Sequence, residues 1–231
     1  MNAHDSPGLA SLVRIPAGDA SLQGELRTPA ESSGIVLFAH GSGSGRHSPR
    51  NQAVARALES AGLSTLLFDL LTEDEEREEE QTRHLRFDIG LLARRLGDAI
   101  RWVDDEPSTR GLAVGLFGAS TGAAAALVAA ARSRGRVGAV VSRGGRPDLA
   151  GDALESVLCP TLLIVGGRDE DVLALNRQAL AQLPGPRRIE VVPGAGHLFE
   201  ESGALEEVSS LAARWFVQHL PADAVPATEF P

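Results

Sequence analysis

The chain has 231 residues, a formal net charge of −9, 43% hydrophobic residues and 23% charged residues. This ordinary globular composition excludes disordered, collagen-like and coiled-coil classes. The length and the lack of a seam predict one large domain over residues 1–220. The negative charge argues against nucleic acid as a partner, because phosphate binding needs a basic face.

Three features predict a cytoplasmic protein. The longest apolar run, Ala123–Ala131, is far shorter than the roughly 20 residues of a membrane-spanning helix, so we expect no membrane partner. The N-terminus holds Asp5 and Pro7 where an export signal would have a basic stretch followed by an apolar one. The single cysteine, Cys159, allows neither an internal disulfide nor a cysteine-based metal cluster, which is compatible with a reducing compartment.

The chain opens with a predicted antiparallel hairpin, because residues 11–16 and 22–27 alternate apolar with polar side chains around a turn at Gly18 and Asp19. Beyond it, short continuous apolar segments are typical of buried parallel strands. We predict these strands at Ile35–Ala39, Thr65–Phe68, Leu112–Phe117, Ala139–Val141, Thr161–Val165 and Ile189–Val192. Apolar residues at three- and four-residue spacing predict the helices between them. These are expected at Asn51–Ser60, roughly Arg86–Val103, Thr121–Arg132, Asp171–Gln182 and Ala204–Leu220.

This alternation after a hairpin predicts a three-layer α/β domain, with helices on both faces of a mostly parallel sheet. Ligands are expected beyond the carboxyl ends of the strands. The connection between Val141 and Thr161 is too short for a large cap domain, so the site should be open. An acidic run over residues 73–80, broken by Arg77 alone, predicts a solvated face, and the alternative is that residues 72–86 form a mobile rim over the site. The Pro- and Ala-rich residues 221–231 predict a loosely held tail.

The strongest local signal is the G-x-S-x-G pentapeptide of residues 118–122, with Ser120 at its centre. It follows the predicted strand Leu112–Phe117 directly and opens an alanine-rich helix. Strand, sharp turn and helix form the context of a nucleophile elbow, in which a serine side chain is exposed at the top of the sheet. The sequence therefore predicts Ser120 as a nucleophile.

A serine hydroxyl needs a base that is itself oriented by a third group. Asp169 follows the predicted strand Thr161–Val165, and His197 follows Ile189–Val192 through a glycine-rich turn. The chain order serine, acid, histidine matches one of the known triad orders. We predict Ser120, Asp169 and His197 as the catalytic residues. The neighbouring acids Glu170 and Asp171 are alternatives to Asp169.

The oxyanion of the intermediate needs two N–H donors. One is expected from Thr121, immediately after the nucleophile. The second is expected from Ser42, with Gly43 as the alternative, because both lie in the glycine-rich loop after Ile35–Ala39. His40, which opens this loop, is interpreted as a structural residue.

The set HGSGSG, GASTG, GGRD and GAGH resembles the α/β-hydrolase superfamily, and within it the small dienelactone hydrolase-like branch, over roughly residues 20–220. The resemblance implies hydrolysis of small-molecule esters or lactones without a cofactor, and we expect no metal. The founding members use cysteine where this chain has Ser120, which favours a general carboxylesterase. Thioesterase, amidase and peptidase activities use the same triad.

Arg143 and Arg146 follow the predicted strand Ala139–Val141. Either guanidinium could bind a substrate carboxylate, and the alternative is an ion pair with Asp148 or with the acidic run.

A nucleotide-binding oxidoreductase is the rival class, because Gly41, Gly43 and Gly45, followed by Asp69, mimic a dinucleotide-binding order. Its glycine spacing is wrong, and the chain has no tyrosine for a short-chain reductase. A non-catalytic binding protein on the same fold is the other alternative.

Overall fold

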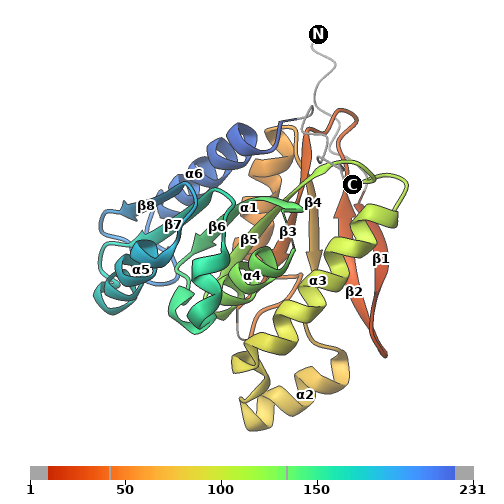
Figure 1. Cartoon of the computed structure of the whole chain (residues 1–231), viewed down its shortest axis with the longest axis horizontal. Helices are drawn as coiled ribbons and strands as arrows, with labels where there is room; N and C mark the ends of the chain where they lie inside the picture. The colour runs from red at the N-terminus through yellow and green to blue at the C-terminus, as the bar shows by residue number, and fades with distance from the viewer. Residues whose placement is uncertain (1–9, 42, 134, 222–231) are drawn as a thin grey trace.

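The computed structural model describes residues 10–41, 43–133 and 135–221. One eight-stranded sheet runs through it in the order β1-β2-β4-β3-β5-β6-β7-β8 (Figure 1). The strands are β1 (Ala10–Ala17), β2 (Ala20–Arg27), β3 (Gly34–Ala39), β4 (Ser64–Phe68), β5 (Ala113–Ala119), β6 (Val137–Arg143), β7 (Thr161–Gly166) and β8 (Arg187–Val192). The α-helices are α1 (Pro49–Ser60), α2 (Glu73–Thr82), α3 (Ile89–Asp105), α4 (Thr121–Arg132), α5 (Glu170–Gln182) and α6 (Ala204–His219). Two 3₁₀ segments complete the order, η1 (Leu85–Phe87) and η2 (Pro147–Ser156).

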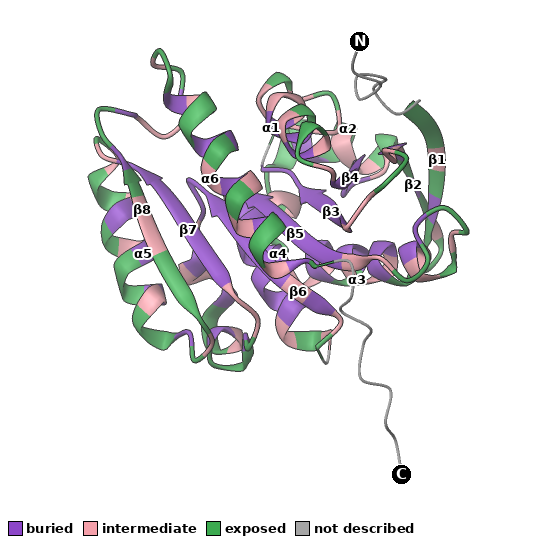
Figure 2. Cartoon of the chain, turned by 90° about the horizontal axis from the view of Figure 1, so that it is seen from above, coloured by how far each residue is buried: buried purple, intermediate pink, exposed green. Residues whose placement is uncertain are grey.

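The hairpin β1–β2 is antiparallel, β2 joins β4 in antiparallel fashion, and all other neighbours pair in parallel. Helices cover both faces, and alternate residues of a strand serve opposite faces: Leu116 packs with α3 and α4, and Phe117 with α1 and α6. The central strands are buried and the edge strands β1 and β8 are partly exposed (Figure 2). The predicted three-layer α/β fold with its N-terminal hairpin is confirmed.

The acidic run forms α2, an element that the predicted helices do not include. Thr72 accepts a hydrogen bond from the Glu75 backbone, and the Glu75 carboxylate accepts one from the Thr72 backbone, which is a capping box. Helix α3 begins at Ile89, later than predicted, because the Asp88 side chain caps it by accepting from Leu91 N at 2.8 Å.

No helix within the described ranges has the length and apolar character to cross a bilayer. Of the expected tail 221–231, all but Pro221 lies outside the described residues.

Candidate active site

Ser120 stands in the turn between β5 and α4, with φ 51° and ψ −124°. Residues with side chains rarely adopt this conformation, and it persists where the surroundings impose it. The space around the turn is filled, since a Cβ on Gly122 would lie 2.2 Å from the Ala39 carbonyl oxygen. Ser120 N donates to the Arg143 carbonyl at 3.4 Å, and the Ser120 carbonyl accepts from Arg146 N at 3.1 Å. This strained and braced turn has the features of a nucleophile elbow.

Asp169 and His197 come together from the loops that follow β7 and β8. Nδ1 of His197 donates a hydrogen bond to Oδ2 of Asp169 at 2.6 Å. That contact fixes the proton on Nδ1 and leaves Nε2 as the basic nitrogen. The Asp169 side chain is 15% exposed and that of His197 is 39% exposed, so the acid is sheltered while the imidazole reaches solvent. The alternative acids Glu170 and Asp171 lie in the first turn of α5.

The loop that carries His197 also lies beside the connection that braces Ser120. A Cβ on Gly144 would lie 3.1 Å from the His197 carbonyl oxygen and 3.7 Å from its Cε1, and Gly144 directly follows Arg143. Among the described residues, no hydrogen bond links the side chains of Ser120 and His197. Such bonds commonly tighten only when substrate binds.

The glycine-rich loop borders Ser120, as the sequence predicts. A Cβ on Gly41 would lie 2.9 Å from the Ser120 Cβ, so this backbone passes next to the nucleophile. Thr121, one predicted oxyanion donor, is buried at the start of α4. Ser42, the other, lies outside the described residues. Gly43 has a φ of 63°. The roles of these N–H groups stay a prediction.

His40 and Asp69 hold the two ends of this loop. His40 Nε2 accepts from Leu70 N at 2.9 Å and its Nδ1 lies 3.0 Å from the Gly41 carbonyl, so the proton belongs on Nδ1. Burial lowers the pKa of His40, which favours this neutral form. Asp69 Oδ1 accepts from Arg46 N at 2.8 Å, and Oδ2 pairs with the Arg46 guanidinium. In a dinucleotide-binding protein an acid at this place would hold a ribose hydroxyl. Here it is occupied by Arg46.

The side chains of Arg143 and Arg146 have different surroundings. Arg146 makes a bidentate ion pair with Asp148, at 2.8 and 2.7 Å. Arg143 is buried, donates to Asn51 Oδ1 at 3.3 Å and lies 6.0 Å from the centre of the Phe199 ring. Burial lowers the pKa of Arg143 to about 10, so it stays a cation near neutral pH. Binding of a substrate carboxylate by either residue stays a prediction.

A narrow cavity joins the glycine-rich loop and the start of α4 to the acidic helix α2. Its lining residues are His40, Gly41, Gly43, Leu70, Leu71, Glu76, Glu79, Arg86, Leu92 and Thr121. The sequence offered this acidic segment as a rim over the site, but neither the helix that carries Glu76 and Glu79 nor the pairing of Glu79 with Arg86 was predicted. The Thr72-x-x-Glu75 capping box was the available signal, since it marks the start of a helix at the point where the chain leaves the sheet.

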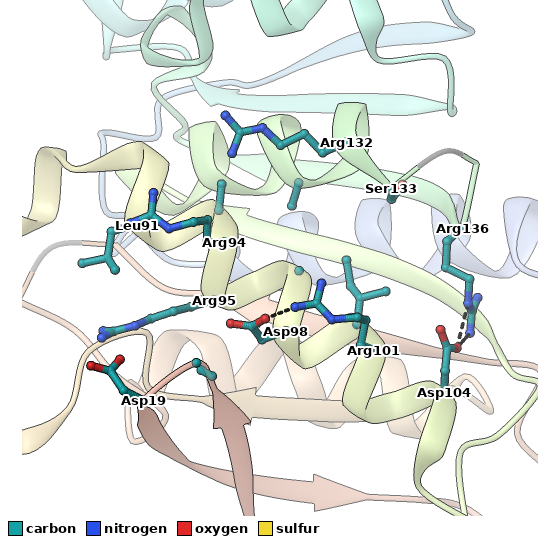
Figure 3. Close-up of a pocket in the computed structure, with 16 residues that line it drawn as sticks. Asp19, Leu91, Arg94, Arg95, Asp98, Arg101, Asp104, Arg132, Ser133 and Arg136 are labelled. Carbon is teal, nitrogen blue, oxygen red and sulfur yellow. Dashed lines mark hydrogen bonds and ion pairs between the residues drawn. The ribbon is translucent and has the colours of Figure 1, made fainter.

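A larger cavity of about 860 Å³ lies away from these residues, between α3, α4 and the β1–β2 turn (Figure 3). Ion pairs Arg101–Asp98 and Arg136–Asp104 lie along it. None of the predicted site residues lines this cavity. The larger cavity and the group of predicted catalytic side chains therefore lie in different parts of the molecule. We locate the candidate active site by its chemistry, at Ser120.

A mostly parallel sheet with a strained serine turn after β5 and an acid–histidine pair after β7 and β8 defines an alpha/beta hydrolase. The chain belongs to this family, since the model of the alpha/beta hydrolase domain matches residues 32–212. The crystal structure of the dienelactone hydrolase from Anabaena variabilis is 56% identical, with a TM-score of 0.91 over 93% of this chain and 100% of that chain. The superfamily and the dienelactone hydrolase-like branch are therefore confirmed.

Two other comparisons place the chain more broadly. Est1E from Butyrivibrio proteoclasticus, at 15% identity, shares the fold with a TM-score of 0.76 over 90% of this chain and 98% of its own. Two Mycobacterium tuberculosis proteins, provisionally named phosphoribosyl transferases, are 58% identical over 218 residues, or 94% of this chain. The match covers 48% of each, so the chain spans about half the length of these curated relatives.

Proposed function

We propose that the protein is a serine hydrolase that cleaves carboxylic esters or lactones of small molecules. The observation that carries the proposal is the 2.6 Å hydrogen bond between Asp169 and His197, because an acid that orients a histidine has a direct catalytic purpose. The strained conformation of Ser120 supports it. The family fold and the name of the Anabaena relative agree with a hydrolase.

In this mechanism Ser120 Oγ attacks the carbonyl carbon while His197 Nε2 takes the hydroxyl proton. The backbone N–H groups of Thr121 and Ser42 hold the resulting oxyanion. Collapse of the intermediate breaks the ester bond, His197 returns the proton to the leaving alcohol, and an acyl group stays on Ser120. Water, activated by His197, then releases the acid. Asp169 stabilises the transient imidazolium.

The chemistry proposed here uses no cofactor and no metal, and its substrate is a small molecule. Thioesters, amides and peptides are the runner-up substrates, because the same groups serve them all. The name of the mycobacterial relatives would point to phosphoribosyl transfer. Those proteins are about twice as long, and the matched half corresponds to the alpha/beta hydrolase model over residues 32–212, so we place hydrolysis first.

The test is hydrolysis of short-chain para-nitrophenyl esters by the wild type, by Ser120→Ala and by Ser156→Ala, an exposed serine in η2. We expect Ser120→Ala to lower kcat by at least about a thousandfold and Ser156→Ala to match the wild type. Mass spectrometry after fluorophosphonate treatment should find one adduct, on Ser120. Turnover that survives in Ser120→Ala, or an adduct elsewhere, would overturn the assignment.

A further inference from the structure

The charge of the narrow cavity is set by α2. Three carboxylates of this helix face inward, and two of them are paired: Glu75 makes a bidentate contact with Arg95 at 2.5 Å on each side, and Glu79 pairs with Arg86. Glu76 lies between them, is partly buried and lines the cavity. Within the described residues it has no hydrogen-bond or ion-pair partner. Because Glu79 and Arg86 pair with each other, Glu76 leaves this wall with a net negative charge.

The helix that carries Glu76 is firmly attached. Arg95, which is buried in α3, binds Glu75 and also donates to the Leu70 carbonyl at 2.7 Å. The Thr72 capping box fixes the first turn of α2. Burial of the Arg95 guanidinium is tolerable because it is paired with a carboxylate and bonded to a backbone carbonyl. The Glu76 charge is thus held at a fixed place beside the site instead of moving with a loop.

Among the described lining residues, Arg86 is the one cation, and it makes its ion pair with Glu79, so it offsets the charge of Glu76 only in part. His40 is held neutral, and Asp69 adds a further carboxylate nearby. Burial, followed by the charges of Asp69, Glu79 and Glu80, raises the pKa of Glu76 against the opposing charge of Arg86. The cavity itself, at about 20 Å³, has room for about one water molecule. Its charge therefore acts on a substrate in the site through the electric field and needs no direct contact.

We propose that Glu76 makes the site selective for neutral or cationic esters and lactones by repelling substrates that carry a carboxylate, which is the opposite of the carboxylate-binding role predicted for Arg143 and Arg146. This inference rests on the proposed function, since it assigns the site at Ser120 a substrate class. The cavity shares Gly41, Gly43 and Thr121 with the proposed oxyanion loop and nucleophile turn. The carboxylate of a substrate bound at Ser120 would feel the Glu76 charge across a partly desolvated space, where Coulomb repulsion is stronger than in bulk water.

The test compares three para-nitrophenyl esters of similar length: the heptanoate, which is neutral, the adipate monoester, which is anionic, and the trimethylammonio-hexanoate, which is cationic. Values of kcat/KM are measured at about pH 8, where glutamate is ionised, for wild type and Glu76→Gln. Glu155→Gln is the matched control, because Glu155 is exposed in η2 and its substitution changes the net charge equally.

We expect Glu76→Gln to raise kcat/KM for the anionic ester about fivefold relative to the neutral one, and to lower it for the cationic ester. Glu155→Gln should leave these ratios unchanged. In the wild type, the ratio of anionic to neutral turnover should rise with salt, because screening shortens the reach of the charge to about 10 Å at 0.1 M and less above it. Ratios that are the same in wild type and Glu76→Gln would overturn the inference while leaving Ser120 as the nucleophile. Ester turnover that persists in Ser120→Ala would overturn the proposed function and this inference with it.

Discussion

The Glu201 carboxylate accepts a hydrogen bond from the backbone N–H of Gly196, at 3.1 Å from each of its oxygens. It also pairs with the Arg168 guanidinium. Gly196 precedes His197 and Arg168 precedes Asp169, so Glu201 connects the two loops that carry the acid and the histidine. The bond from Gly196 lowers the pKa of Glu201, which keeps this connection charged near neutral pH.

Replacing Glu201 should disturb the orientation of His197 without removing a reacting group. We expect Glu201→Ala to lower kcat about tenfold or more with a smaller change in KM, because small misplacements of catalytic groups are costly. Steady-state kinetics on a para-nitrophenyl ester gives the changes in kcat and KM separately. Glu200→Ala is the control, because Glu200 makes an exposed ion pair with Arg50 and should have little effect. Equal losses in both variants would contradict a positioning role for Glu201.

The identity of the acid can be tested by two asparagine substitutions. Asp169→Asn keeps the shape of the side chain but cannot hold the proton on His197 Nδ1, so kcat should fall on the order of ten-thousandfold. Asp171→Asn should cost little, because this residue is exposed in the first turn of α5. Both are measured with circular dichroism as a check on folding. A larger loss in Asp171→Asn would move the acid to that residue.

The nucleophile turn should not tolerate a methyl group at Gly122. The added Cβ would lie 2.2 Å from the Ala39 carbonyl oxygen and 2.5 Å from that of His40, and these backbone atoms cannot move aside as a flexible side chain could. We expect Gly122→Ala to destabilise the protein by more than about 3 kcal/mol or to prevent folding. Gly97→Ala, inside α3 with only the end of Arg101 nearby at 3.9 Å, should instead stabilise it by about 0.5–1 kcal/mol. Urea unfolding compares the two, and equal destabilisation would refute the steric argument.

Lowering the pH should reduce the free energy of unfolding, and His40 should account for part of this loss. Burial lowers the pKa of this residue below its ordinary value of 6.5. As the pH falls below 6.5, the unfolded chain takes up a proton at His40 that the folded chain does not, so stability is lost from there downward until the folded pKa is passed. The free energy of unfolding, measured between about pH 7.5 and 5, should show this slope in the wild type.

The variant His40→Gln should be less stable throughout but have a flatter pH dependence over that window. His47→Gln, at an exposed histidine, should keep the slope of the wild type. An unchanged slope in His40→Gln would show that other groups cause the acid sensitivity.

Much of the fold could be predicted because its signals are local. Strands such as Thr161–Gly166 are continuous apolar runs that are buried on both faces, and helices such as α6 follow the three- and four-residue spacing of their apolar residues. Helix α2 could not be recognised in this way, since nine of its ten residues are charged or amide side chains. What places it is Arg95, twenty residues further along the chain.

The candidate site also has a part that could be predicted from the sequence and a part that could not. The positions of Ser120, Asp169 and His197 follow from the rule that parallel strands deliver their loops to one edge of the sheet. Contacts between loops, such as that of Asp69 with Arg46 or of Glu201 with Gly196, depend on loop conformations that no sequence period encodes. For the same reason the environment of Arg143, against Asn51 and Phe199, could not be foreseen.

Helix α2 and η1 form a contiguous segment with defined ends. The segment starts at the Thr72 cap after β4 and stops at the Asp88 cap of α3. The pair of Arg86 with Glu79 lies inside it, and Arg95 attaches it to α3 through Glu75. None of the proposed catalytic residues belongs to it. Exchange of this segment alone, among chains that keep an arginine at the position of Arg95, would change the wall beside the site while the elbow, acid and histidine stay in place. If Glu76 sets the substrate class as proposed, a single contiguous replacement is enough to change substrate preference in this scaffold.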